Sequence, residues 1–528
     1  MKNRILFVVC LCMVCSVHAN DQPDSLPVNG TLVWDFGLRI IVDHELQQRL
    51  PGSWDLDSSL YRGAGITSRI GPHVHGSAIN DNLFQVDGVD QNDVLIGTGA
   101  FAISPEVIES VELITGGMPA EIGHAMGGVF LANTKSGRNE WHGSLRLDYI
   151  DSEWVDDPDF DQNADMPAQE DYLIPTVTLS GPILRDRLWF LASYGMYSCE
   201  EESTHGSQLV KNQKEFTHPF LKLTARPSNN HEVNVTWFSQ MLIEDNFEGY
   251  PMDIRELWQE QETGSHTMIV DWTWQITDTI STELRYGRYV KEWNIYPQKK
   301  SEDPRDAPFE NSDRSYNYNN STIWSEDTRE SEQIILETDW MVEDLMGIHE
   351  IKAGVEIQTQ SWCLMNRIPG GAIYSLFMSS GIAGRSLLFG PRDKQSSSEM
   401  ISFFVQDEWA LNQRFMLNVG LRFEEKEFED YMGKQSASSW SWGDFERTSW
   451  IGQDESMDET PMEFRNMIAP RIHLKWDVFG NQSTKVHVFW GRYFNPFDLQ
   501  LADELVYEVN SSGWYFESYS GPEWSDGD

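Results

Sequence analysis

Basic residues are scarce in this sequence. Its 528 residues include 39 Lys and Arg against 83 Asp and Glu, which gives a formal net charge of −44. Recognition of nucleic-acid phosphates requires a basic surface. The charge balance therefore argues against a nucleic-acid partner.

Cysteine is also rare, and three of the five cysteines lie in the first 15 residues. Residues 1–19 have the parts of a secretory signal: basic residues at the start, an apolar stretch at 5–17 and a small-residue cleavage site ending at Ala19. We expect this signal to be removed. Only Cys199 and Cys363 would remain, so the chain is not a disulfide scaffold, although one bridge between them is left open.

Long hydrophobic runs are absent after residue 19, and the pattern therefore predicts no membrane-spanning helix. The chain is nevertheless 40% hydrophobic and 12% aromatic, which is too rich for a disordered acidic chain. Trp and Tyr, with an apolar body and a polar tip, suit the interface between lipid and water. An exported chain of this kind is expected to be either soluble or a β-barrel.

Alternation of apolar and polar residues is the main structural pattern from residue 142 onward. In 415–424, for example, Phe415, Val419 and Phe423 alternate with Asn418 and Arg422. Such a strand has one face suited to lipid and one suited to water, although large soluble sandwiches, propellers and β-helices also alternate. The pattern predicts strands at 142–150, 172–183, 188–198, 216–227, 231–242, 266–277, 280–293, 330–343, 347–362, 398–411, 415–424, 466–479 and 484–494.

The connections between these strands alternate between short and long. Short connections lie at 184–187, 228–230, 278–279, 344–346, 412–414 and 480–483, and long ones begin at 151, 199, 243, 294, 363 and 425. Short turns at one rim and long loops at the other are typical of an outer-membrane barrel. A propeller would instead repeat at a constant blade length. The predicted fold class is therefore mainly β, with antiparallel transmembrane barrel strands.

Acidic residues are concentrated in the long connections. Segment 151–171 contains nine acidic residues and no basic one. Solvation of extended loops accounts for this composition, and divalent-cation binding by clustered carboxylates is the alternative. The spacing fits no EF-hand loop, and we predict no metal site and no cofactor.

Residues 39–141 are Gly-rich and contain an ordered series of short motifs. The series begins at 84–89 (Phe-Gln-Val-Asp-Gly-Val), continues through 103–123 and 127–129, and ends at 134–137 and 142–144. Its glycines permit tight turns and close backbone approach, and Asp87-Gly88 is a turn signal. The motif residues, to which we assign structural or gating roles, are Asp87, Gly88, Thr115, Gly116, Gly117, Pro119, Ala120, Glu121, Gly123, Gly127, Gly128, Thr134, Lys135 and Gly137.

This series closely resembles the plug domain of TonB-dependent outer-membrane receptors, especially their Oar-like branch. Downstream segments such as 179–183, 405–409 and 469–471 resemble the barrel of that branch. The resemblance implies a small α+β plug at 39–141 inside a barrel that starts at 142. It also implies a bacterial outer-membrane location, contact with membrane lipid, an unknown extracellular ligand, and import driven by the TonB energy-coupling complex.

Two features depart from that branch. Only the short segment 20–38 precedes the plug; Thr31, Leu32 and Val33 are a possible TonB contact, or alternatively the first plug strand. His75-Gly76 stands where relatives tend to have Arg-Gly shortly before the Asp-Gly turn. His73 and His75 could bind a metal from one face of a strand, but such a pair is more often solvated or hydrogen-bonded.

The number of strands is smaller than the resemblance implies. Family barrels have about 22 strands, whereas this sequence contains about 13, or 14 if 504–519 forms one. We therefore expect a truncated or split receptor in residues 142–528. A non-transporting surface receptor or adhesin is the alternative function. A secreted hydrolase is the third hypothesis, but the mature chain has no nucleophile elbow, phosphate loop or zinc-protease motif, and we predict that it is not an enzyme.

Overall fold

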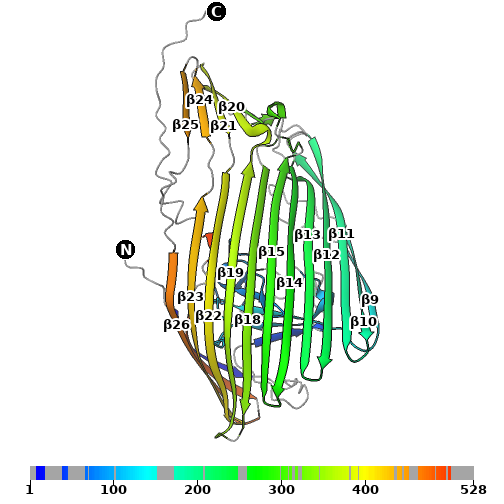
Figure 1. The fold of residues 1–528 in the computed structure, drawn as a ribbon, viewed down its shortest axis with the longest axis vertical. Coiled ribbons are helices and arrows are strands. Elements are labelled where there is room, and N and C mark those ends of the chain that lie inside the picture. Colours follow the sequence, from blue (N-terminus) through cyan, green and yellow to red (C-terminus); the bar gives the residue numbers. More distant parts are fainter. Residues whose placement is uncertain are drawn as a thin grey trace, which may run out of the picture.

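A computed structural model describes residues 8–17, 39–45, 66–68, 71–99, 103–150, 172–205, 208–247, 259–297, 299–301, 303–306, 308–311, 316–318, 321, 324–343, 345–379, 382–389, 392–432, 437–442, 445–450, 462–481, 483–494 and 498–500. A tall, curved antiparallel sheet is its main feature (Figure 1). In the part of the chain that is described, no helix is long and apolar enough to cross a membrane.

All thirteen predicted segments are strands of this large sheet, and consecutive strands are antiparallel neighbours. They are β9 (His142–Ile150), β10 (Tyr172–Leu184), β11 (Leu188–His205), β12 (Gln208–Ser228), β13 (His231–Phe247), β14 (Gln259–Thr277), β15 (Ile280–Pro297), β18 (Trp324–Val342), β19 (Ile348–Arg367), β22 (Arg392–Asn412), β23 (Phe415–Met432), β26 (Met462–Asp477) and β27 (Thr484–Tyr493).

Most strands are longer than predicted at the end away from the short turns. The expected long connection from 199 is wrong, because β11 runs to His205 and β12 begins at Gln208. Beyond the lipid both faces of a strand meet water, so the alternation fades there. The backbone ladder continues because its hydrogen bonds do not depend on that alternation.

The large sheet has apolar residues on its outer face and polar residues on its inner face. On β23, Val419 and Leu421 are each 46% exposed, whereas Asn418 and Arg422 are 2% and 0% exposed. The outward apolar series runs from Phe415 to Phe423, about 26 Å along a tilted strand. At a tilt of about 40° this series spans about 20 Å of height, which is close to the apolar band of about 25 Å in outer-membrane barrels.

Tryptophans border this band near the short turns. Trp274, Trp340 and Trp476 are exposed and lie close to the ends of β14, β18 and β26. Trp476 stacks on Phe415 of the neighbouring strand, with ring centroids 5.7 Å apart. Such an aromatic girdle marks the interface between membrane and water.

A smaller sheet lies inside the curve of the large sheet (Figure 1). Its strand order is β2 (Arg39–Asp43), β7 (Ile108–Ile114), β8 (Val129–Thr134), β5 (Leu83–Val86) and β6 (Val89–Asp90), with β5 and β8 parallel. A hairpin of β3 (Ile66–Ser68) and β4 (Pro72–Val74) and the 3-10 helices η1 (Ile79–Asp81) and η2 (Pro105–Val107) accompany it. We call the described residues of 39–141 the inner domain.

The core of the inner domain continues into the large sheet, which we call the wall. Phe84 stacks on Phe130, with ring centroids 4.5 Å apart. Their cluster also contains wall residues of β11 to β14: Leu191, Phe220, Phe238 and Ile269. The inner domain is therefore packed against this side of the wall by apolar contact.

A third sheet lies at the end of the molecule where the long connections are (Figure 1). Three of those connections supply its six strands: β16 (Phe309–Asn311), β17 (Tyr316–Tyr318), β20 (Ala372–Ser379), β21 (Ile382–Phe389), β24 (Ala437–Trp442) and β25 (Phe445–Trp450). The 3-10 helices η5 (Pro304–Asp306) and η6 (Pro369–Gly371) lie in two of them. The sequence did not predict these strands, because their pairing joins connections that are far apart in the chain.

The large sheet is not closed among the described residues: its order runs from β1 to β9, and these two are its edges. β1 (Val8–Val17) lies within the predicted signal and pairs with β27, from Val8 opposite Tyr493 to Val17 opposite Thr484. Cleavage of the signal stays a prediction. The possible strand at 504–519 lies outside the described residues. Cys199 and Cys363 form no disulfide, so the bridge left open by the sequence is not formed.

Candidate functional site: the interface between the inner domain and the wall

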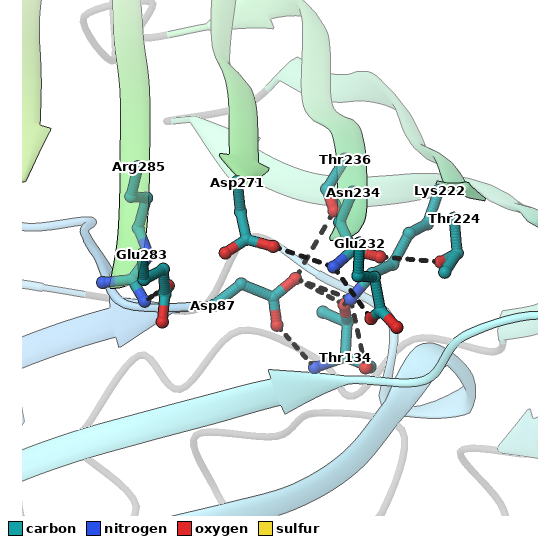
Figure 2. A network of polar contacts seen from close by, with 10 residues as sticks. All are labelled: Asp87, Thr134, Lys222, Thr224, Glu232, Asn234, Thr236, Asp271, Glu283 and Arg285. Atoms are coloured by element: carbon teal, nitrogen blue, oxygen red, sulfur yellow. Dashed lines mark hydrogen bonds and ion pairs between the residues drawn. The ribbon is translucent and has the colours of Figure 1, made fainter. Parts of the chain in front are cut away.

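Asp87 joins the inner domain to the wall (Figure 2). It lies in the predicted turn between β5 and β6, and Gly88 follows with φ +77°. The Asp87 carboxylate accepts hydrogen bonds from the backbone N–H of Thr134 at 2.8 Å and from its hydroxyl at 2.6 Å. Lys222 of β12 donates to the same carboxylate at 3.1 Å, and Thr236 of β13 does so at 3.4 Å. Asp87 thus forms the turn and also holds the inner domain to the wall; we call such a contact an anchor.

Neighbouring wall residues extend this polar network. Asn234 donates to Asp271 at 2.8 Å, and Arg285 forms an ion pair with Glu283 (Figure 2). A Cβ at Gly88 would overlap the Arg285 guanidinium. The positive φ favours glycine here, whereas the Arg285 guanidinium is the end of a flexible side chain and could shift.

Asp93 makes a second anchor farther from the short turns. Its carboxylate is 2.6 Å from Lys291 of β15 and 2.6 Å from Arg329 of β18. Burial alone would raise the pKa of Asp93, but these two cations hold that pKa below its usual value. Asp93 is therefore an anion at neutral pH and a strong partner for the wall.

The loop from 115 to 128 makes a third anchor. Lys352 of β19 lies 2.5 Å from Glu121, whose backbone N–H donates to Gln406 at 3.1 Å. Burial opposes ionisation of Glu121, yet the Lys352 charge keeps its pKa below the usual value. Arg471 of β26 donates to the carbonyl of Ile122 at 2.6 Å. Wall cations thus bind both the side chain and the backbone of this loop.

Arg422 of β23 is the most buried of these wall cations, with 0% exposure. It lies 2.6 Å from Glu356, forms an ion pair with Glu424, and donates to the carbonyl of Glu121 at 3.2 Å. His124 of the loop is 3.8 Å from Glu424, and burial lowers the pKa of His124, so its imidazole is neutral at pH 7.

The remaining motif residues serve the packing of the inner domain. Asn82 binds the backbone N–H of Gly128 at 2.7 Å, and a Cβ at Gly123 would lie 2.5 Å from Arg422. Lys135 donates to the Glu106 carbonyl at 2.8 Å. Gly116, Gly117, Pro119, Ala120 and Gly127 are buried, while Thr115 is half-buried. The possible TonB contact at Thr31, Leu32 and Val33 lies outside the described residues.

Gly137 is expected to tolerate no side chain. A Cβ there would overlap the backbone of Phe190 on β11, and backbone moves less readily than a side chain. Gly137→Ala should therefore destabilise the inner domain by about 1–3 kcal/mol. Urea-dependent proteolysis of the inner domain measures this. Gly143→Ala is the control, because a Cβ there would meet only atoms at 3.5 Å or beyond; equal losses would show that the contact with Phe190 is unimportant.

Asp90 is expected to make the stability of the inner domain depend on pH. Burial raises its pKa from 3.8 to about 6. A raised pKa in the folded state gives stability that is complete below about pH 4 and is lost as the pH rises through about 6. The free energy of unfolding of Asp90→Asn should therefore exceed that of wild type by up to about 3 kcal/mol at pH 8 and should equal it at pH 4. Urea unfolding at both pH values tests this; an equal difference at the two would contradict it.

Residues 498–500, which follow β27, also contact the inner domain. The backbone N–H groups of Leu499 and Gln500 donate to the carbonyls of Val94 and Leu95, each at 3.0 Å. Leu499 is 0% exposed in a cluster with Val94, Trp362 and Phe428. A segment on the side of the long connections thus reaches the loop that contains Asp93.

His73 is held by a backbone contact. Its Nδ1 lies 2.8 Å from the Ser77 carbonyl and acts as a donor, so Nε2 is the nitrogen left to accept a partner. Among the residues that the structure describes, no group of three His, Cys, Asp or Glu side chains could hold a metal ion.

Sequence reasoning missed the wall partners of these anchors: Lys222, Lys291, Arg329, Lys352, Arg422 and Arg471. A signal was present, because each is a basic residue on the polar face of a strand in a chain with few basic residues. Nothing in the sequence indicated which acidic residue of the inner domain each basic residue would contact.

Comparisons with known proteins agree with this geometry. Residues 203–521 match the family model "Outer membrane beta barrel domain". The chain is 22% identical to the TonB-dependent transporter Oar of Myxococcus xanthus, over 82% of this chain and 48% of that protein. It thus spans about half the length of this curated relative.

Solved structures share the fold. The outer membrane transporter YddB from Escherichia coli has a TM-score of 0.65 at 14% identity, over 88% of this chain and 62% of that one. The alcaligin outer membrane receptor FauA from Bordetella pertussis has a TM-score of 0.56 at 13% identity, over 88% and 64%. These proteins are transporters and receptors rather than enzymes. The family match covers more than half of the sequence, and the chain therefore belongs to the outer membrane beta barrel domain family of the bacterial outer membrane, with similarity to TonB-dependent transporters.

Proposed function

We propose that this chain imports an extracellular substrate through a barrel in which the inner domain is the plug. The observation that carries the proposal is the way the inner domain is held: its Asp87, Asp93 and Glu121 each bind a wall cation inside a polar lumen. Water can replace such contacts, and a typical hydrogen bond contributes only about 0.5–1.5 kcal/mol net. A plug held in this way can leave its seat and return.

The relatives support the same function. Oar is a TonB-dependent transporter, and YddB is an outer membrane transporter. We propose that the motif residues at 87–137 seat the plug, and that Thr31, Leu32 and Val33 contact the TonB complex. The substrate is an extracellular ligand of unknown identity, captured on the side of the long connections.

We also propose that further antiparallel strands close the barrel, so that this chain is a truncated or split form. The support is the open sheet, whose edges are β1 and β9 among the described residues. Unpaired backbone groups at a sheet edge are costly in lipid. A native partner or continuation carrying about eight such strands is therefore expected.

Cross-linking to TonB tests the proposal. A photoreactive amino acid at Leu32 should cross-link to TonB in intact cells, whereas one at the exposed Ser136 should not. Deletion of residues 20–38 should abolish uptake in a screen of labelled iron chelates, sugars and peptides while leaving surface binding intact. Absence of the cross-link, with uptake unchanged for every compound, would favour the alternative of a non-transporting receptor or adhesin.

A further inference from the structure

A cavity separates the inner domain from one side of the wall. Its volume is about 150 Å³, and it lies between the inner domain and strands β15, β18, β19 and β22. Gln85, Asp90 and Glu121 line it from the inner domain, and Arg285, Glu337 and Glu356 line it from the wall. This volume accommodates several water molecules or one small polar group.

The opposite side of the inner domain is packed against the wall by apolar contact. There Val86 and Val89 share an apolar cluster with Leu191, Phe220 and Phe238 of β11 to β13. Separating that cluster would expose apolar surface at about 25 cal/mol per Å². The polar contacts around the cavity can instead be replaced by water. The inner domain should therefore separate from the wall first on the cavity side.

Most charges at the cavity are paired. Arg39 is 3.2 Å from Glu112, Lys352 is 2.5 Å from Glu121, and Arg285 pairs with Glu283. Arg422 pairs with both Glu356 and Glu424, which leaves one negative charge in that cluster.

Two further carboxylates at the cavity have no basic partner within ion-pair distance. Asp90 accepts only from the amide groups of Asn92 and Gln358. Glu337 has no hydrogen bond or ion pair to any described residue. Lys426 acts on Asp90, and Lys352 and Arg285 act on Glu337, from beyond ion-pair distance. The cavity therefore has an excess of negative charge, only partly offset by these cations, when Asp90 and Glu337 are ionised.

Acidic side chains continue toward the short turns. Asp339, Glu350 and Glu408 interact electrostatically with Glu121 and lie on β18, β19 and β22 near their short-turn ends. Lys352 and Arg39 are cations that act on this group. A solute that leaves the cavity in this direction therefore meets a second acidic region.

We propose that this cavity is part of the import route and that it accepts cationic solutes or cationic groups of a larger substrate. The inference rests on the proposed function, because it places the route on the β15 to β22 side of the plug. A field of this sign attracts cations and repels anions, and salt weakens it.

Charged thiol reagents measure the sign of this field. In a chain with Cys199→Ser and Cys363→Ser, we would introduce Gln85→Cys and compare a cationic methanethiosulfonate (ethyltrimethylammonium) with an anionic one (ethylsulfonate). Each reagent forms a mixed disulfide and releases methanesulfinate. Rates are divided by those of a free small thiol. Ser136→Cys, at an exposed site of the inner domain, is the matched control.

The ratio of the cationic to the anionic reaction rate should be at least fivefold higher at residue 85 than at residue 136. Glu337→Gln should lower this ratio at residue 85 at least twofold, and high salt should also lower the ratio there. Leu131 lines the same cavity. If Gln85→Cys fails to fold, Leu131→Cys takes its place. Equal preferences at the two sites, or no effect of Glu337→Gln, would overturn the assignment of a cation-accepting cavity.

A second measurement tests which side opens. Glu337→Cys on β18 and Thr236→Cys on β13 face the lumen at similar distances from the short turns. As urea is raised with the purified protein in detergent, the cysteine at 337 should react with a bulky maleimide at a lower urea concentration than the cysteine at 236. The reverse order would overturn the route. Neither measurement needs TonB or a ligand, so failure here is distinguishable from failure of the proposed function.

Discussion

Replacing Arg422 by methionine is expected to release the 115–128 loop from the wall and to destabilise the seated inner domain by about 3–5 kcal/mol. The guanidinium is fully buried and serves Glu356, Glu424 and the carbonyl of Glu121. Its removal leaves two buried carboxylates without their cation, and the cost of a buried charge without a partner dominates such changes. Proteolysis of the inner domain in increasing urea, with the strand region followed on the same gel, measures the loss.

Two further variants separate charge from packing at this position. Arg422→Lys keeps the charge but cannot reach both carboxylates with a planar fork, so it should recover only part of the stability. Arg422→Met combined with Glu356→Gln and Glu424→Gln removes the unpaired charges and should recover more than half of it. If the triple variant were as unstable as Arg422→Met alone, lost packing rather than charge would be the cause.

Asp87→Ala is expected to cost about 3 kcal/mol in the stability of the seated inner domain. The substitution leaves Lys222, whose side chain is 8% exposed, buried without an anion, and it also removes the acceptor for two groups of Thr134. The same urea-dependent proteolysis measures the effect. A double-mutant cycle with Lys222→Met should give a coupling of at least 1 kcal/mol, which is within the range for residues in one network.

The pair Arg39 and Glu112 provides the matched comparison for Asp87. Its two side chains are 22% and 23% exposed at a separation of 3.2 Å. Because solvent screens this pair more strongly, Glu112→Ala should cost less than about 1 kcal/mol. Similar losses for Asp87→Ala and Glu112→Ala would mean that Asp87 is only a turn residue and not an anchor.

The strands of the wall were predictable because their signal is local. Phe415, Val419 and Phe423 alternate with polar residues at the period of a strand, and the lipid selects one face of every such segment. The short turns between strands were predictable for the same reason. The family resemblance of 84–142 also depended on sequence alone.

Contacts between distant residues were not predictable in this way. Lys222 is 135 residues from Asp87, and Arg422 is 301 residues from Glu121. In a chain with 83 acidic residues, no pattern states which acid meets which base. The third sheet, with its six short strands, also forms only because three separate connections meet in space.

The sequence by itself thus determined the strands, their two faces and the family, because periodicity and motif order act over neighbouring residues. Only the tertiary structure decided that Asp87, Asp93 and Glu121 are held by wall cations, and that one side of the inner domain is apolar while the other borders a charged cavity. Those features arise when the curved sheet brings its polar face around the inner domain. Electrostatic pairing and burial depend on distances in space, which chain position does not specify.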